Sequence, residues 1–323
     1  MVPALEADPA GQYLPPRSRD ALARQWRQQA LLAEDELPAG WRRGDIRRAR
    51  LQNHRLGLPS GGPWHCPPLI DGMALQQHFQ QRLKVDLRWS CRSTQADWRR
   101  QPEPWPRLVI SESQRGGRGR LGRSWQSAPT GNLYLSLLVS LQRVDELSLL
   151  PLLSGLVIAE LLGRHGVDSG LKWPNDVLVN GAKIAGVLVE ADLASRPARL
   201  AIGVGLNWWL PATHRGALDR PATDLREQLG NHALPDRTGL LRDLTEGLLQ
   251  QVDLLEAGQG ASRLTAWRSR DLLRGHRLRI DDGHNEYLGR AASIDEQGRL
   301  LLQCGDGLKR LSSGEVTRVW IDQ

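Results

Sequence analysis

Hydrophobic and polar positions follow different patterns in three successive parts of the chain. Residues 1–66 are polar, rich in arginine and interrupted by prolines, and they predict two helices, around Asp20–Ala33 and Asp45–Leu56. The run Gly57–Pro63 predicts a loop or linker, because glycine and proline break regular elements. We therefore expect residues 1–66 to form a region of their own.

Residues 67–273 contain both the alternating pattern of strands and the longer apolar spacing of helices. Short apolar or alternating runs predict strands, and longer apolar or amphipathic runs predict helices. The expected strands are Val85–Trp89, Leu108–Ile110, Asn132–Val139, Val177–Val179, Ile184–Val189 and Leu200–Leu206, and the expected helices are Met73–Leu83, Leu147–Leu162 and Thr238–Glu256. Asn180-Gly181 is a strong hairpin signal. The pattern indicates an α+β fold, with a mixed or antiparallel sheet and helices on one face.

Residues 274–323 carry only short β patterns. Strands are expected at Arg277–Ile280, Tyr287–Ile294, Arg299–Gln303 and Lys309–Leu311, separated by turns rich in glycine and aspartate. About fifty residues of this kind suit a small five-stranded barrel.

Length and charge narrow the class of protein. A chain of 323 residues is long enough for two or three domains. Its net charge of +7 favours anionic partners, such as nucleotides, nucleic acid or acidic proteins, without choosing among them. Cys66, Cys91 and Cys304 are isolated, which fits a reduced, cytoplasmic chain better than a disulfide framework or a zinc site.

No segment predicts a membrane span or a signal peptide. The apolar stretch Leu147–Leu162 is shorter than the roughly 20 residues that a span requires, and it contains Ser154 and Glu160. A helix in the core of a soluble protein explains it. We expect no membrane partner.

Lysine is rare, and its positions single out one segment. The chain has four lysines against 39 arginines, and two of the four, Lys172 and Lys183, lie within the twenty residues Leu171–Glu190. A compact, mobile ammonium differs from a planar guanidinium and suits a carboxylate or phosphate that changes during a reaction. Chance in a chain of skewed composition is the alternative.

Two motifs carry candidate chemistry. Gln114–Trp125 is rich in glycine and arginine, so its backbone N–H groups and guanidinium groups suit a phosphate or an adenylate, although a flexible basic loop is an equal alternative. The segment fits neither a phosphate-binding loop of the GK[ST] kind nor the dinucleotide fingerprint. In the second motif, Lys172–Glu190, Pro174 sets a turn, and Asp176 with the two lysines could hold ATP phosphates and Mg²⁺. For Asp176 alone, an ordinary salt bridge is the stronger interpretation.

Taken together and in this order, these motifs resemble the biotin protein ligase family. Gly117–Trp125 reproduces its GRGRxGRxW loop, and Lys172–Glu190 matches its KWPNDxxxxxxKxxGxLxE signature. Ser93-Thr94-Gln95 and Gly203–Asn207 match its Ser-Thr-Asn/Gln and GxGxN segments, and Gly314-Glu315-Val316 matches its closing strand. The resemblance implies a class II synthetase-like catalytic domain over residues 67–273 and an SH3-like barrel over 274–323.

The resemblance also implies a two-step reaction. The biotin carboxylate attacks the α-phosphorus of ATP to give biotinoyl-AMP and pyrophosphate, and a lysine of a carrier domain then displaces AMP. The implied catalytic residues are Lys183, Arg118 and Arg120. The implied biotin-binding residues are Ser93, Thr94, Gln95, Gln114, Arg118, Gly119, Arg120 and Lys183.

The same resemblance implies a nucleotide site formed by Gly117, Arg123, Trp125, Lys172, Asn175, Asp176 and Asn207, with Asp176 as a candidate ligand of Mg²⁺. For Trp125, a role in the core is nearly as well supported. The implied partner is the biotin carboxyl carrier protein of acetyl-CoA carboxylase, and a homodimer is an open alternative.

Two other functions remain open. Some members of the family carry an N-terminal winged helix-turn-helix and repress biotin-synthesis genes, and Arg42-Arg43, Arg47-Arg48, Arg50 and Arg55 would suit phosphate contacts with DNA. The prolines and Gly57–Pro63 interrupt that order of elements, so a degenerate, solvated remnant is the favoured interpretation of residues 1–66. Lipoate–protein ligase shares the fold, but its RRxSGGG-type loop is not in this sequence.

Overall fold

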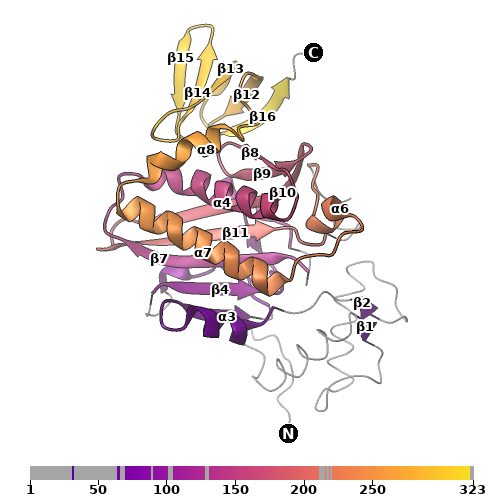
Figure 1. Cartoon of the computed structure of the whole chain (residues 1–323). Coiled ribbons are helices and arrows are strands. Elements are labelled where there is room, and N and C mark those ends of the chain that lie inside the picture. The colour runs from indigo at the N-terminus through magenta and orange to yellow at the C-terminus, as the bar shows by residue number, and fades with distance from the viewer. Residues whose placement is uncertain are drawn as a thin grey trace. The chain divides into compact units, whose positions relative to one another are not determined.

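The structure is a computed structural model that describes residues 31–32, 64–65, 70–88, 90–100, 105–127, 131–210, 215, 218 and 220–320. The chain divides into two compact units. Unit 1 comprises Met1–Val139 with Gly203–Arg242, and unit 2 comprises Ser140–Ile202 with Asp243–Gln323. Figure 1 gives the labels of the helices and strands.

The largest sheet has seven strands in the order β3-β4-β7-β11-β10-β9-β8. Strand β3 is parallel to β4, whereas β4–β7, β10–β9 and β8–β9 are antiparallel. The predicted mixed sheet is therefore confirmed. The bounds are β3 Lys84–Arg88, β4 Arg107–Ser111, β7 Leu133–Leu141, β8 Gly170–Lys172, β9 Asp176–Val179, β10 Ala182–Asp192 and β11 Ala198–Leu206.

Unit 1 is built on strands that are buried on both faces. All five residues of β4 and the first seven of β7 are buried, which explains why β7 reads as a nearly continuous apolar run. Helix α3, Gly72–Phe79, packs on β3, where a β-carbon on Gly72 would lie 2.9 Å from Leu87 Cδ2. Asp71 caps the helix by accepting from the N–H groups of Met73 and Ala74.

Helix α3 ends earlier than the sequence predicts. The apolar spacing predicts a helix to Leu83, but Gln80 has φ 48° and its backbone N–H bonds to Gln76 O. The left-handed residue stops the helix and turns the chain into β3. Nothing in the residue type of Gln80 announces this turn.

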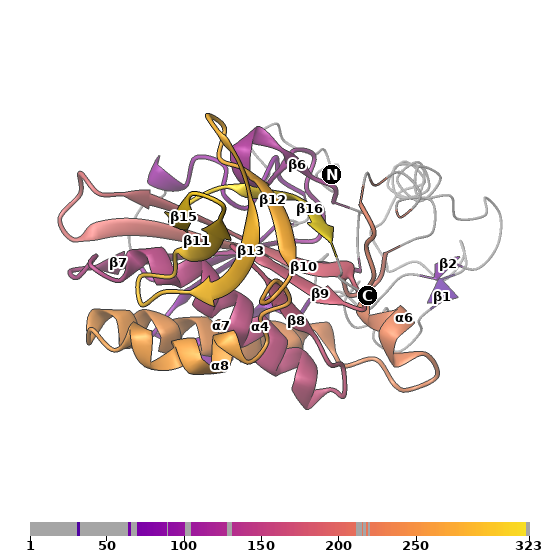
Figure 2. The same cartoon turned by 90° about the horizontal axis from the view of Figure 1, so that it is seen from above.

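Unit 2 contains an almost fully buried helix, α4, Leu150–Arg164, preceded by the 3-10 turn Leu147–Leu149. The segment Leu147–Arg164 has the length and composition of a membrane span, yet most of it is buried among β8, β9 and β10, as a core helix is. Helix α7, Arg237–Glu256, packs on it, because a β-carbon on Gly247 would lie 2.5 Å from Val157 Cγ1. Figure 2 shows α4, α8 and the part of α7 in unit 2 on one side of β8–β10, as expected.

The predicted hairpin at Asn180-Gly181 is confirmed. Strands β9 and β10 pair with Ala182 opposite Val179, and the two turn residues have φ 50° and 79°. A two-residue turn with positive φ at both positions matches the right-handed twist of the strands, and Asn-Gly is the pair best able to adopt it.

The C-terminal part of unit 2 is a five-stranded antiparallel sheet in the order β15-β14-β13-β12-β16. Its four predicted strands and the closing strand are present. In Figure 1, helix α8, Leu264–Arg268, lies between α4 and this sheet. The bounds are β12 Arg277–Asp281, β13 Glu286–Ile294, β14 Leu300–Cys304, β15 Gly307–Leu311 and β16 Glu315–Trp320.

Little of the N-terminal region lies among the described residues. Leu31–Leu32 (β1) pairs with Trp64–His65 (β2), so the helix predicted over Asp20–Ala33 is wrong at those two positions. The helix predicted over Asp45–Leu56, the linker Gly57–Pro63 and the arginines between residues 42 and 55 lie outside the described residues.

Candidate active site

The glycine-rich motif in unit 1 forms a small hairpin instead of an irregular loop. Strands β5, Gly117–Arg118, and β6, Ser124–Trp125, pair with Gly117 opposite Trp125. Between them, Arg120–Gly122 makes a 3-10 turn, and the N–H of Gly119 bonds to Arg123 O at 2.8 Å. The hairpin presents Arg118 and Arg123 to solvent and leaves Arg120 half-buried.

Gly117 is a glycine because two neighbours occupy the place of a side chain. A β-carbon there would lie 2.5 Å from Trp125 O and 2.8 Å from Ser127 Oγ. The Gln114 amide nitrogen would be 3.2 Å away. The close approach lets Gln114 Nε2 donate to Ser127 Oγ at 3.0 Å.

The predicted Ser-Thr-Gln segment lies beside Gln114. An isolated parallel bridge pairs Cys91 with Gln114, and the side chains of Ser93, Thr94 and Gln95 are buried. The N–H of Thr94 donates to Gln114 Oε1 at 2.8 Å. Four of the predicted biotin-binding residues are thus brought together in unit 1.

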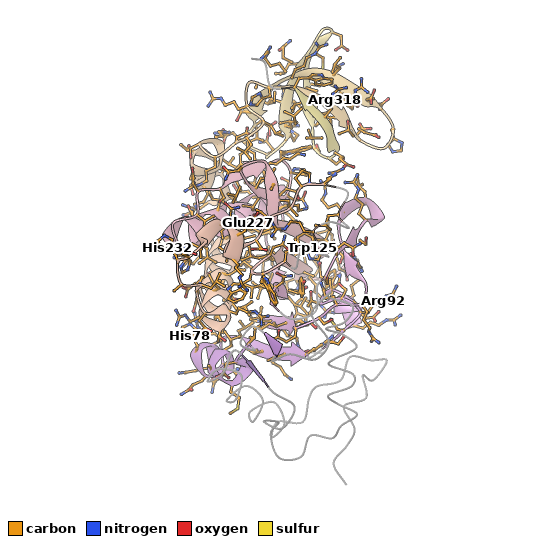
Figure 3. All side chains as sticks on the ribbon, turned by 90° about the vertical axis from the view of Figure 1, so that its right-hand side faces the viewer. His78, Arg92, Trp125, Glu227, His232 and Arg318 are labelled. Carbon is orange, nitrogen blue, oxygen red and sulfur yellow. The ribbon has the colours of Figure 1, made fainter. Side chains whose placement is uncertain are left out.

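The two glycines of the Gly203–Asn207 segment support two of these side chains. A β-carbon on Gly203 would collide with the Gln95 amide, and one on Gly205 would lie 2.4 Å from Trp125 Cε2. Trp125 therefore packs against β11 at Gly205 and is partly buried, whereas Arg92 is exposed to solvent (Figure 3). The absence of side chains at Gly203 and Gly205 leaves the space that Gln95 and Trp125 occupy.

Asn207, the last residue of that segment, is buried and forms hydrogen bonds with the loop that follows β11. Its Nδ2 donates to Thr223 O at 3.0 Å, and its own carbonyl accepts from the N–H of Leu225. Leu225 begins helix α6, Leu225–Leu229, which Asp224 caps. The side chain fixes the loop that follows β11.

Four polar residues that the motifs do not mark complete the site in unit 1. Ser136 Oγ donates to Thr94 Oγ1 at 2.8 Å, and Asn132 Nδ2 donates to Tyr134 OH at 2.9 Å. Burial raises the pKa of the Tyr134 phenol, and its hydrogen bond with Asn132 and the positive charge of Arg237 oppose the shift. Ser136 interrupts the apolar run of β7, and that interruption was the signal available in the sequence.

The predicted lysine site lies in unit 2. Strand β9 places Asp176 opposite Lys172 on β8 and opposite Gly186 on β10. Lys183 Nζ forms an ion pair with Asp176 Oδ1 at 2.6 Å, and both side chains are partly exposed. The salt bridge considered for Asp176 is present.

Lys172 and Asp176 share the face of these strands that α4 does not cover. A β-carbon on Gly155 of α4 would touch Leu171 and Val177, and side chains alternate between the faces of a strand. Asn175 bonds to the neighbouring strand, with Nδ2 donating to Val187 O at 2.6 Å and Asn175 O accepting from Val187 N. Asn175 therefore holds the turn that orients Asp176.

Two sequence models of known families match the chain. The Biotin/lipoate A/B protein ligase family matches residues 87–207, and the Biotin protein ligase C terminal domain matches residues 275–318. The first range contains the predicted residues of both units, and the second covers most of the five-stranded sheet. Fold and site thus define a ligase of the biotin and lipoate class.

Comparison with individual proteins narrows this class to the biotin protein ligases. The chain is 34% identical over 220 residues to the biotin–[acetyl-CoA-carboxylase] ligase of Mycobacterium tuberculosis, covering 66% of this chain and 79% of that one. It is 28% identical over 279 residues to the bifunctional ligase/repressor BirA of Bacillus subtilis, covering 84% of each. The biotin protein ligase of Aquifex aeolicus in complex with biotin and ATP superposes with a TM-score of 0.62 at 26% identity, covering 72% of this chain and 97% of that one. The chain belongs to the biotin protein ligase family.

Proposed function

We propose that this protein activates biotin as biotinoyl-AMP and transfers it to a lysine of the biotin carboxyl carrier protein of acetyl-CoA carboxylase. ATP-dependent ligation of biotin to protein is the activity of the family to which the chain belongs. The identity of the carrier protein is the more specific part of the proposal. The relative from Mycobacterium tuberculosis, which is named for that carboxylase, supports it. A cytoplasmic location is proposed with it.

The observation that carries the proposal is the paired polar environment of Gln114. Biotin ends in a neutral cyclic urea, which offers one carbonyl acceptor and two N–H donors and so needs both donors and acceptors from a buried site. Thr94 and Gln114 are held to each other, with Ser93 and Gln95 buried beside Thr94. We assign the urea to these four residues.

Lys183 is proposed to act on the reacting groups. In the first step a biotin carboxylate oxygen forms a bond to the α-phosphorus, and the bond from that phosphorus to pyrophosphate breaks. Two anions must approach, so an ammonium beside them lowers the barrier. The 2.6 Å ion pair with Asp176 would hold Lys183 in one orientation before the substrates bind.

The hairpin of residues 117–125 is proposed to cover the adenylate. Gly117 and Gly119 let the backbone approach it, and Arg118, Arg120 and Arg123 add positive charge. Excluding water protects a mixed anhydride from hydrolysis. In the second step the amine of the carrier lysine loses a proton and bonds to the acyl carbon, and AMP leaves with the electron pair of the broken C–O bond.

The remaining nucleotide contacts are proposed for Lys172, Asn175, Asp176, Asn207 and Trp125. Mg²⁺ at Asp176 is a weaker proposal, because Asp176 Oδ1 already pairs with Lys183. Among the described residues, no three His, Cys, Asp or Glu side chains are grouped to hold a metal ion. A metal bound to the ATP phosphates would therefore enter with the nucleotide, and no step is derived through it.

Repression of biotin-synthesis genes is the second candidate function. The bifunctional ligase/repressor of Bacillus subtilis, which the chain resembles over 84% of its length, favours it. The DNA-binding region would fall in residues 1–66, and it stays a prediction, as does a homodimer.

The test is biotin- and ATP-dependent labelling of a carrier domain by the native chain and by Lys183→Ala. Lys309→Ala is a matched control, because Lys309 forms an ion pair of equal length, 2.6 Å, with Asp306 on the C-terminal sheet. We expect labelling to fall by about a hundredfold or more in Lys183→Ala and to be unchanged in the control. Equal labelling by both variants would remove Lys183 from the reaction, and a native chain that labels with lipoate but not biotin would change the substrate.

A further inference from the structure

A side-chain hydrogen bond closes the base of the glycine-rich hairpin in unit 1. Gln114 precedes strand β5 and Ser127 follows strand β6, and Gln114 Nε2 donates to Ser127 Oγ at 3.0 Å. The chain before β5 is held by its backbone, because the N–H of Gly116 donates to Arg92 O at 2.8 Å. The bond from Gln114 to Ser127 therefore fixes the end of the hairpin to its beginning.

The hydroxyl of Ser127 serves two partners at once. An amide nitrogen can only donate, so the Ser127 oxygen accepts from Gln114. The single hydroxyl proton is then donated to Trp125 O, at 3.4 Å, the longer of the two bonds. Trp125 pairs with Gly117 across the hairpin, and a β-carbon on Gly117 would lie 2.8 Å from Ser127 Oγ. The hydroxyl thus lies against both strands of the hairpin as well as against Gln114.

Gln114 belongs to the proposed urea site as well as to the base of the hairpin. The backbone N–H of Thr94 can only donate, so it fixes Gln114 Oε1 toward itself, at 2.8 Å, and leaves Nε2 on the side of Ser127. One N–H of Nε2 is donated to Ser127, and the second can donate to the carbonyl of a ligand. The residue that would hold the head of biotin is therefore tied to the hairpin that would cover the adenylate.

We infer that Ser127 is a positioning residue: by accepting from Gln114 and donating to Trp125, its hydroxyl keeps the base of the hairpin closed, and so holds the hairpin over the adenylate while Gln114 holds the urea. The inference rests on the proposed function, which assigns the urea to Gln114 and the cover to the hairpin. Ser127 itself would touch neither substrate. Its effect would be on how long biotinoyl-AMP survives before a carrier lysine arrives.

Loss of the hydroxyl should therefore expose the adenylate to water. In hydrolysis a water oxygen bonds to the acyl carbon, the C–O bond to the phosphate breaks, AMP leaves with its electron pair, and a water proton passes to the solvent. Ser127→Ala removes the acceptor of one Gln114 N–H and the donor to Trp125 O, whereas Thr94 still fixes the amide. Biotin would still be activated, but its adenylate would no longer be protected.

The test follows radiolabelled ATP in the presence of biotin and the absence of a carrier, with AMP and biotinoyl-AMP separated by chromatography. The native chain should form about one equivalent of biotinoyl-AMP and then release AMP slowly. We expect Ser127→Ala to form the same amount and to release AMP about tenfold faster, the effect of one hydrogen bond. Ser262→Ala is the matched control, because Ser262 Oγ donates to the carbonyl of Gln259 on an exposed turn of unit 2, and it should behave as the native chain does.

A merely structural role for Ser127 would lower the amount of biotinoyl-AMP without hastening the release of AMP, and that result, or an unchanged release, would overturn the inference. If Ser127→Ala does not fold, Ser127→Cys keeps a similar size with a weak donor and a weak acceptor, and should hasten the release in the same direction. A native chain that forms no biotinoyl-AMP would overturn the proposed function, and the inference with it. A native chain that forms it while the variants release AMP no faster overturns the inference alone.

Discussion

Gln95 lies directly on Gly203: a β-carbon at that glycine would stand 2.2 Å from Gln95 Oε1 and 2.7 Å from its Cδ. Contacts this short do not occur between real side chains, so any residue larger than glycine must displace the buried amide. A glycine in β11 thus determines where a polar group from the segment after β3 can lie.

Gly203→Ala is therefore expected to weaken biotin binding and to destabilise unit 1. Forcing one carbon into this contact costs about 1–3 kcal/mol of unfolding free energy, and the displaced Gln95 should lower biotin affinity by about tenfold. Calorimetric titration and urea unfolding measure the two effects. Gly163→Ala is the control, because open space surrounds Gly163 on helix α4. Unaltered biotin affinity in Gly203→Ala would show that Gln95 does not contribute to the site.

Breaking the buried ion pair between Arg237 and Glu112 is expected to destabilise unit 1. Arg237 Nη2 donates to Glu112 Oε2 at 2.8 Å and to Asn132 O at 2.7 Å, and both charged side chains are almost fully buried. Removing one partner leaves a buried charge alone, so Arg237→Met should lower the unfolding free energy by about 3–5 kcal/mol.

Urea unfolding of Arg237→Met and of Asp145→Asn makes the comparison. Asp145 forms an ion pair with Arg143 at 2.7 Å, but both side chains are about half exposed, and such pairs contribute little. A loss in Arg237→Met no larger than that in Asp145→Asn would contradict the assignment.

Asp271 is expected to make the protein less stable as the pH rises. Burial raises the pKa of its carboxyl above the usual value, and hydrogen bonds from the backbone of Leu273 and Arg274 oppose the shift only partly. Between the unfolded and the folded pKa the native state holds the extra proton, so stability falls as pH increases through that window and stays lower above it.

Asp271→Asn removes this penalty. The variant should match the native chain below the unfolded pKa of Asp271 and exceed it in unfolding free energy at neutral pH. Denaturant unfolding across pH 3 to 8 measures the difference between the two proteins. A difference that does not grow with pH would exclude the titration of Asp271 as its cause.

The sequence predicted the elements whose signals are local. Asn180-Gly181 specifies its own turn. The apolar runs of β7 and α4 predict that both elements are buried, whichever elements pack against them. The family motifs likewise singled out Gln114, Thr94 and Lys183 as candidate site residues, whose roles stay predictions. The end of helix α3 at Phe79 could not be predicted, because a left-handed Gln80 has no signature in residue type.

The long-range polar contacts of unit 1 could not be predicted either, because their partners are far apart in the chain. Ser136 lies 42 residues from Thr94, and Arg237 lies 125 residues from Glu112. From the sequence alone, Tyr134 and Ser136 are predicted only to lie in a buried strand. Only the packing of strands reveals which polar groups meet.

The C-terminal sheet matches a family model of its own, yet Trp173 argues against treating it as a separable part. Trp173 Nε1 donates to Gly298 O at 3.0 Å, and a β-carbon on Gly298 would lie 2.6 Å from Leu152 of α4. Trp173 directly follows Lys172, and Asp176 lies three residues further on. The C-terminal sheet is thus, in this chain, part of the packing that supports the strand bearing Lys172. Loss of the residues after 274 would remove the carbonyl to which the Trp173 indole donates.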